Sequence, residues 1–161
     1  MNFTIKLIVL AVIIAAGAAL PVDPTEAGKI YNELQNEIQS INTVQSIFGN
    51  NFVHCLIMFT PFLGPLYGMF IFFNTGLVLG IIAAAEHVNV GLLFVSLFLM
   101  PHSWLEFIAY SFALSESILL SMAIFKRRFK RELKRTCIII TVCALVLLLA
   151  AVAEIILISL I

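Results

Sequence analysis

The chain has 161 residues, of which 62% are hydrophobic and only 11% are charged, and its formal net charge is zero. Soluble domains are about half apolar and about one quarter charged, so this composition excludes a conventional water-soluble domain. We expect an all-α protein: a polytopic bundle of about five transmembrane helices in the lipid bilayer, with one long extracytoplasmic amphipathic helix. No nucleic acid partner is expected.

The first apolar run covers residues 3–20. It is only just long enough to cross a bilayer as a helix. Small residues near its end, Ala16, Gly17 and Ala18, also suit the cleavage site of a signal peptide. Of these two interpretations we favour a retained first transmembrane helix.

The only sizeable polar stretch follows, and it predicts one amphipathic helix over residues 23–48. Asp23, Pro24 and Glu26 are the residue types that begin a helix, and Gly49 offers a stop. The polar face is uncharged or acidic, so it lacks the basic residues that attract helices to anionic lipid. The apolar stripe either binds a partner or a second copy of the chain, or packs on this protein's own helix ends or the outer leaflet.

Four more apolar runs predict transmembrane helices over residues 51–73, 75–100, 104–125 and 136–161. The first of them is expected to bend, because it contains Pro61 and Pro65. The second is interrupted by Glu86 and His87, and each half is too short to cross a hydrocarbon core about 30 Å thick. It therefore either crosses once as a broken or tilted helix, or enters the bilayer and returns.

A basic segment, residues 126–135, holds seven of the nine Lys and Arg residues. Cytoplasmic loops are enriched in such residues, so we expect this segment and the N-terminus to be cytoplasmic and the C-terminus to be extracytoplasmic. The turn at Pro101 and the amphipathic helix then lie outside, and a turn at Asn74 lies inside. Because a re-entrant segment over 75–100 would place Lys6 and the basic segment on opposite faces, a single crossing is preferred. The basic segment is interpreted first as a topology signal and second as a site for anionic lipid or an acidic partner.

Polar residues inside apolar runs are costly and therefore need an explanation. Four carboxylates stand in or beside these runs, namely Glu86, Glu106, Glu116 and Glu154. They serve either as neutral hydrogen-bonded groups that join helices, or in ion or proton handling. The residues selected as functional candidates are Asn74, Glu86, His87, Pro101, His102, Glu106 and Glu154.

The most specific local pattern begins at Pro101. With Pro101 as a first helical residue, His102 and Glu106 fall four apart on one face, close enough to hydrogen-bond or to share a metal. A zinc site needs at least three protein ligands, and the spacing of Glu86, His87 and His54 does not force them to this place. We therefore expect this pair to stabilise the start of a helix, and we predict no metal or cofactor. The three cysteines lie in apolar runs and are expected to pack as small hydrophobes.

At these residues the chain resembles the stage II sporulation protein M family of integral membrane proteins. The family's Pro-His-Gly-x-x-Glu-like segment appears as residues 101–106, with Ser103 in place of the glycine. Similar features follow the family order along the chain: an amphipathic stretch after a first helix, Asn50 and Asn51 before the second span, Asn74, Gly76 and Gly80 in the third, the basic loop, and Glu154 late in the last helix. The resemblance implies a non-catalytic membrane scaffold that holds other enzymes at the membrane.

Three functions then compete. A scaffold is expected to bind partners, or a second copy of itself, through the amphipathic helix and through small-residue helix faces such as Gly76 and Gly80. A transport component is expected to bring Glu86, His87, Glu106 and Glu154 together around a midplane cavity. An intramembrane hydrolase would need a metal at His102 and Glu106. We favour a scaffold without enzymatic activity.

Overall fold

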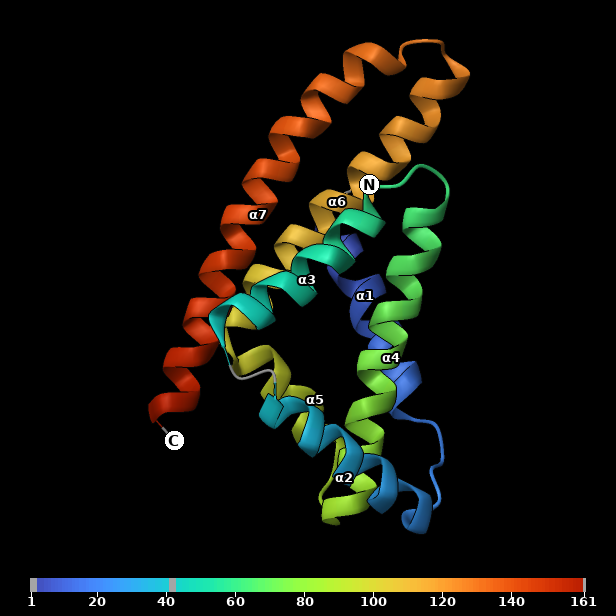
Figure 1. The fold of residues 1–161 in the computed structure, drawn as a ribbon. Coiled ribbons are helices and arrows are strands. Elements are labelled where there is room, and N and C mark those ends of the chain that lie inside the picture. Colours follow the sequence, from blue (N-terminus) through green and yellow to red (C-terminus); the bar gives the residue numbers. More distant parts are fainter. Residues whose placement is uncertain (1–2, 41–42, 161) are drawn as a thin grey trace. The chain divides into compact units, whose positions relative to one another are not determined.

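The computed structural model describes residues 3–40 and 43–160, and its regular elements over these ranges are seven α-helices (Figure 1). Three of them are long and apolar enough to cross a membrane, over Leu63–Glu86, Pro101–Phe125 and Glu132–Leu160. Two shorter apolar helical segments, Ile8–Ala18 and Val90–Leu99, accompany them. The predicted all-α membrane class is thereby confirmed.

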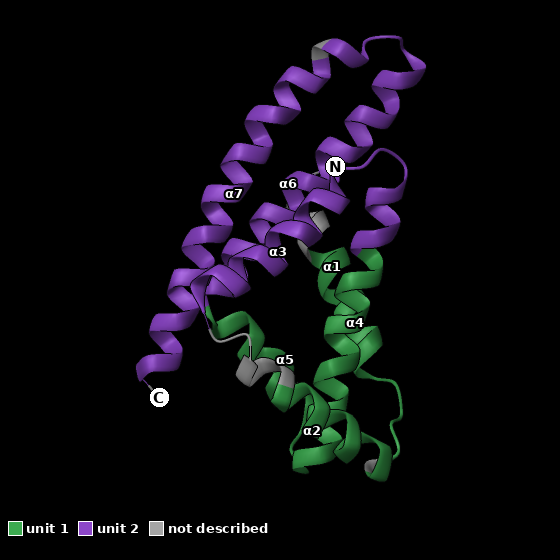
Figure 2. Cartoon of the chain, viewed as in Figure 1, with its two compact units in different colours: residues 1–42, 69–100 green, residues 43–68, 101–161 purple. Residues whose placement is uncertain are grey.

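The chain divides into two compact units, coloured separately in Figure 2. Unit 1 comprises residues 1–42 and 69–100, and unit 2 comprises residues 43–68 and 101–161. Unit 1 holds α1 (Phe3–Ala18), α2 (Pro24–Ser40), most of α4 (Leu63–Glu86) and α5 (Val90–Leu99). Unit 2 holds α3 (Val44–Met58), α6 (Pro101–Phe125), α7 (Phe129–Leu160) and the first turns of α4.

In unit 1, α1 and α4 pack backbone against backbone. A Cβ atom on Gly76 would collide with the carbonyl oxygen of Ile14 and lie 2.9 Å from the Ala18 nitrogen. A Cβ atom on Gly17 would likewise collide with the carbonyl oxygen of Phe73. Small residues allow such close approach between membrane helices, where van der Waals contact is a main source of association. The small-residue faces expected from the sequence therefore serve packing within the chain at this point.

In unit 2, α3 runs parallel to α6, and α7 returns antiparallel beside both. Asn51, in the middle of α3, contacts Glu106 near the start of α6. Thr60, just after the end of α3, contacts Ser117 in the second half of α6. Several small or apolar side chains are fully or almost fully buried here, including Cys55, Met58, Ala113, Cys143 and Leu147. The small side chains among them, those of Cys55, Ala113 and Cys143, let the three helices approach closely.

The chain turns before α4 at an earlier position than the sequence predicted. The expected turn at Asn74 is absent: Asn74 lies inside α4, and the chain instead turns between Met58 and Leu63. Pro61 cannot donate a helical hydrogen bond, and Phe62 has a positive φ of 64°. A single asparagine has no comparable power to end a helix, because it keeps its N–H and its allowed helical geometry.

Hydroxyl groups of α6 satisfy the backbone groups that this turn frees. Ser117 Oγ donates to the Thr60 carbonyl oxygen at 2.5 Å, and the Phe62 N–H donates to Ser121 Oγ at 2.8 Å. Ser117 is fully buried. Unpaired backbone groups are costly at membrane depth, so these two serines stabilise the turn.

The polar stretch also differs from the single helix expected over residues 23–48. It forms two helices, of which α2 ends at Ser40 and α3 begins at Val44. Asp23 begins α2 as expected, because its carboxylate accepts the Thr25 N–H at 2.8 Å. Thr43 begins α3 in the same way by accepting the Ser46 N–H at 3.2 Å. Gly49 lies inside α3 and stops no helix, and the part of the predicted helix at residues 41–42 lies outside the described residues.

The third apolar run is interrupted between α4 and α5, at residues 87–89. Residues 75–86 belong to α4, and α5 has only 10 residues, about 15 Å of helix. That length is about half of a hydrocarbon core. The helix after it, α6, begins at Pro101, the first helical position expected for this proline, and it contains the predicted span over residues 104–125.

Candidate functional site

A cluster of polar side chains lies inside unit 2, around the first turns of α6. Because α6 starts at Pro101, it aligns His102, Glu106 and Tyr110 at four-residue spacing along one face. The sequence placed His102 and Glu106 on this face, and the structure adds Tyr110. We call the set His102, Glu106, Tyr110, Asn51 and Glu154 the polar cluster.

The nearest partner of Glu106 comes from α3. Asn51 Nδ2 donates a hydrogen bond to Glu106 Oε1 at 2.6 Å. A hydrogen bond to a carboxylate is among the stronger kinds, and it offsets part of the cost of placing this group among apolar helices. Spacing alone could not reveal this pairing, because 55 residues separate the two side chains.

Glu154 reaches the same place from α7. Its carboxylate interacts electrostatically with Glu106 and with the imidazole of His102. Three of the predicted candidates, His102, Glu106 and Glu154, are therefore brought together from two helices. Two carboxylates repel when both are charged, so a proton or a positive imidazole nearby stabilises the arrangement.

A second polar pair extends the cluster towards α3 and α4. His54 Nδ1 and the Tyr67 hydroxyl lie 2.6 Å apart, and their rings are tilted against each other. Tyr67 and Cys55 both lie within electrostatic range of Tyr110. The side chains thus form a connected polar seam through the apolar interior of unit 2, which the sequence indicated only at its His102 end.

The polar cluster combines the imidazole of His102 with the carboxylates of Glu106 and Glu154. His102 Nδ1 is buried and has no hydrogen-bond partner among the described residues. Within residues 3–40 and 43–160 no group of three or more His, Cys, Asp or Glu side chains is arranged to hold a metal ion. An imidazole beside two carboxylates can accept or release a proton, whereas a zinc site needs at least three ligands.

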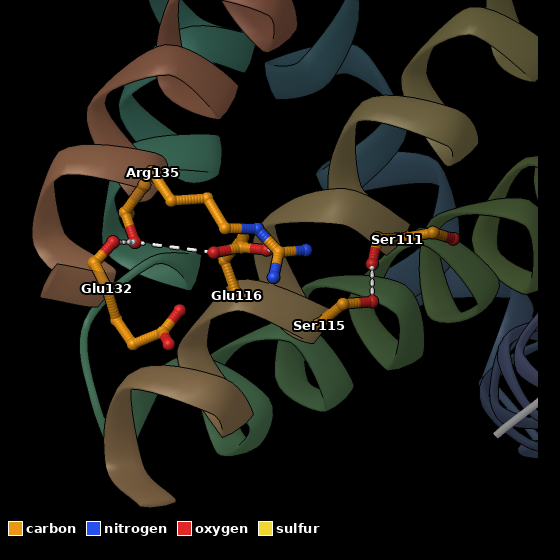
Figure 3. A network of polar contacts seen from close by, with 6 residues as sticks. Ser111, Ser115, Glu116, Glu132 and Arg135 are labelled. Atoms are coloured by element: carbon orange, nitrogen blue, oxygen red, sulfur yellow. Dashed lines mark hydrogen bonds and ion pairs between the residues drawn. The ribbon is translucent and has the colours of Figure 1, made fainter. Parts of the chain in front are cut away.

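Glu116 lies outside the polar cluster, nearer the other end of α6, and has a partner of its own. It is 2% exposed, and Arg135 of α7 forms an ion pair with it at 3.3 Å (Figure 3). Thr136 Oγ1 also donates to Glu116 Oε2 at 3.3 Å and contacts the Glu132 carbonyl oxygen. One cation of the basic segment is therefore used to neutralise a buried carboxylate and to join α6 to α7.

The remaining candidates lie in unit 1. Asn74 is half-buried within α4. Glu86, at the end of α4, contacts Tyr31 of α2, and this hydrogen bond raises the pKa of Tyr31. The Gln35 amide opposes that shift by donating to the Tyr31 hydroxyl at 2.7 Å. These contacts link α2 to the end of α4.

His87 has a structural role at the end of α4. It has a positive φ of 53°, and the Val88 N–H donates to the Ala83 carbonyl oxygen at 3.1 Å. This is the arrangement in which a helix ends with one left-handed residue, a position that favours glycine. The imidazole is exposed and contributes no hydrogen bond to this cap.

We therefore expect His87→Gly to stabilise the protein, by about 1 kcal/mol, because glycine adopts the left-handed conformation without a Cβ penalty. Thermal unfolding of the purified protein in detergent micelles measures the change. Val88→Gly is the control, since Val88 has no positive φ and should lose stability. Lower stability of His87→Gly would show that the imidazole makes a contribution of its own.

Comparison with known proteins gives one result for the whole chain. The family model described as Stage II sporulation protein M matches residues 4–157. That range includes every residue of the polar cluster. No curated protein and no solved structure matches the chain.

Proposed function

Because this chain belongs to the stage II sporulation protein M family, we propose that it is a non-catalytic, multi-pass membrane scaffold that recruits a protein partner through α2. The observation that carries the proposal is the division of α2 into two faces. One face packs within the chain: Ala27 is fully buried, and Tyr31 and Leu34 are half-buried. The other face is free for a partner.

The free face of α2 is polar. Its exposed side chains with hydrogen-bonding or charged groups are Glu26, Lys29, Asn32, Glu33, Gln35 and Asn36. Ile30 is the one exposed large apolar side chain among residues 25–36 of α2, whereas Ala27 is buried and Leu34 half-buried, so a partner would meet mainly polar groups. The partner is therefore a protein with a polar surface rich in hydrogen-bond donors, because the carboxylate and amide oxygens on α2 accept hydrogen bonds.

The proposal places α2 outside the cytoplasm. With the segment between α6 and α7 cytoplasmic, the turn before α4 is cytoplasmic too, because the Phe62 ring packs edge-on against Phe125 with centroids 5.7 Å apart. The start of α3 and Pro101 then lie on the extracytoplasmic side, together with α2. In this proposed topology the long apolar helices α4, α6 and α7 cross the bilayer, the shorter helices α1 and α3 complete the connections between its two sides, and α5 begins and ends outside.

The test is co-purification of full-length protein from native membranes after mild cross-linking, followed by mass spectrometry. We expect a recurrent protein partner, and a loss of about thirtyfold in its affinity when Glu33→Ala and Asn36→Ala are combined, because each lost hydrogen bond is worth about 1 kcal/mol. Lys134→Ala, an exposed charge outside α2, is the control. Recovery of the protein alone, or equal recovery with both variants, contradicts the scaffold.

A second candidate function is ion or proton handling, which the meeting of His102, Glu106 and Glu154 favours. Proton flux in liposomes, detected with a pH-sensitive dye and lost in Glu106→Gln, would replace the scaffold as the primary function. Absence of flux removes this candidate. No comparable observation favours a metal-dependent hydrolase, because the described residues contain no group of three or more His, Cys, Asp or Glu side chains arranged to hold a metal ion.

A further inference from the structure

The connection between α6 and α7 places several cations around one tight turn. α6 ends at Phe125, and the Arg128 N–H donates back to the Ala123 carbonyl oxygen at 2.9 Å. Arg127 takes the left-handed position, with a φ of 53°. The cations Lys126, Arg127, Arg128 and Lys130 are all exposed. The chain thus reverses within a few residues and keeps these side chains at one end of the helix pair.

Two adjoining hollows lie at this turn. The larger is open, has a volume of about 570 Å³ and is lined by Arg127, Arg128, Phe129 and Lys130. The smaller, about 160 Å³, is lined by the apolar residues Leu119, Met122 and Ala123 and by the charged residues Lys126, Arg128 and Glu132. Arg128 lines both hollows, so the cationic rim continues into the smaller hollow, and we call the apolar side of that hollow, formed by Leu119, Met122 and Ala123, the apolar slot.

We propose that these hollows bind an anionic phospholipid, with the headgroup phosphate at Arg127, Arg128 and Lys130 and the start of an acyl chain beside Leu119 and Met122. Charge complementarity supports the headgroup position, because Glu132 is the only carboxylate among the lining residues and two cations accompany it in the smaller hollow. Arg135 is not counted, since it is paired with Glu116.

The combination of two surfaces selects a lipid over other anions. Free phosphate or an acidic protein segment would use the cations and leave the apolar slot without a function. α6 and α7 both carry long apolar candidate spans, and the segment joining such spans lies at the membrane surface. A phospholipid has its phosphate and its first methylene groups at that depth, in the order in which the hollows occur.

Purified full-length protein in phosphatidylcholine nanodiscs, titrated with phosphatidylglycerol and read by native mass spectrometry, tests the proposal. We expect phosphatidylglycerol to be retained, and Arg128→Gln to weaken its binding about fivefold, because a cation near a membrane surface contributes about 1 kcal/mol. Arg128→Lys keeps the charge and should restore most of the binding. Lys134→Gln, which removes an exposed cation outside both hollows, is the matched control.

Three results would overturn the proposal. The first is equal retention of phosphatidylglycerol and phosphatidylcholine. The second is an equal effect of Arg128→Gln and Lys134→Gln, which would indicate only general attraction by the basic segment. The third is displacement of the lipid by inorganic phosphate at similar concentration, which would identify a site for phosphate alone. Size-exclusion profiles of every variant verify that a loss of binding does not come from unfolding.

Discussion

Gly76→Leu is expected to abolish the folded state of unit 1, and Gly76→Ala to destabilise the protein by about 1–3 kcal/mol. The Cβ atom of either variant would collide with the Ile14 carbonyl oxygen and approach the Ala18 nitrogen to 2.9 Å. Both are backbone atoms of a helix, so they cannot move aside as a flexible side chain does. Only separation of α1 from α4 relieves the clash, and separation loses the close contact that holds membrane helices together.

The measurement is thermal unfolding in detergent micelles, together with the fraction of protein that elutes as a single species. Gly49→Ala is the matched control, because a Cβ atom there meets no other atom within 4 Å. That variant should gain about 0.5–1 kcal/mol in stability, because alanine leaves the unfolded chain less conformational freedom than glycine does. Equal stability of Gly76→Ala and Gly49→Ala would contradict the close packing of α1 and α4.

Arg135→Gln is expected to destabilise unit 2 by about 1–3 kcal/mol, because it leaves the Glu116 carboxylate uncompensated in an apolar environment. The lower part of that range is favoured by the exposure of the Arg135 side chain, which is 58% accessible. Glu116→Gln should cost less, since it removes the buried charge together with the need for a cation and keeps an oxygen for Thr136. The double variant should therefore resemble Glu116→Gln alone.

A double-mutant cycle in thermal or denaturant unfolding measures this coupling. Lys134→Gln removes a neighbouring exposed cation and should leave stability unchanged. Strictly additive effects of the two substitutions would mean that the ion pair contributes nothing to stability. A greater loss in the double variant than in Arg135→Gln would mean that Glu116 has a further partner.

The fold class was predictable because it depends on composition and on long apolar runs, which a sequence displays directly. The positions at which helices end within those runs were harder to predict. Asn74 and Gly49 carry the residue types of turns, yet both lie inside helices. The turn before α4 depends on Ser117 and Ser121, which are more than 50 residues away in the chain. Local propensity cannot report partners that only the tertiary fold supplies.

The candidate site was predictable where it is local. His102 and Glu106 share a face of α6 because they are four residues apart, and this spacing is visible in the sequence. Asn51 and Glu154 join them from α3 and α7, and no periodicity links residues on different helices. Glu86 and His87, also selected as functional candidates, lie at the end of α4, where Glu86 contacts Tyr31 of α2 and His87 has a positive φ.

The turn between α3 and α4 can form its hydrogen bonds to Ser117 and Ser121 only after α6 has been synthesised. The Thr60 carbonyl oxygen and the Phe62 N–H are synthesised well before Ser117 and Ser121, their partners in α6. While the ribosome is still making α4 and α5, the turn therefore lacks two of its hydrogen bonds, and water or the translocation machinery must solvate those groups. The turn acquires its final bonding only when α6 arrives.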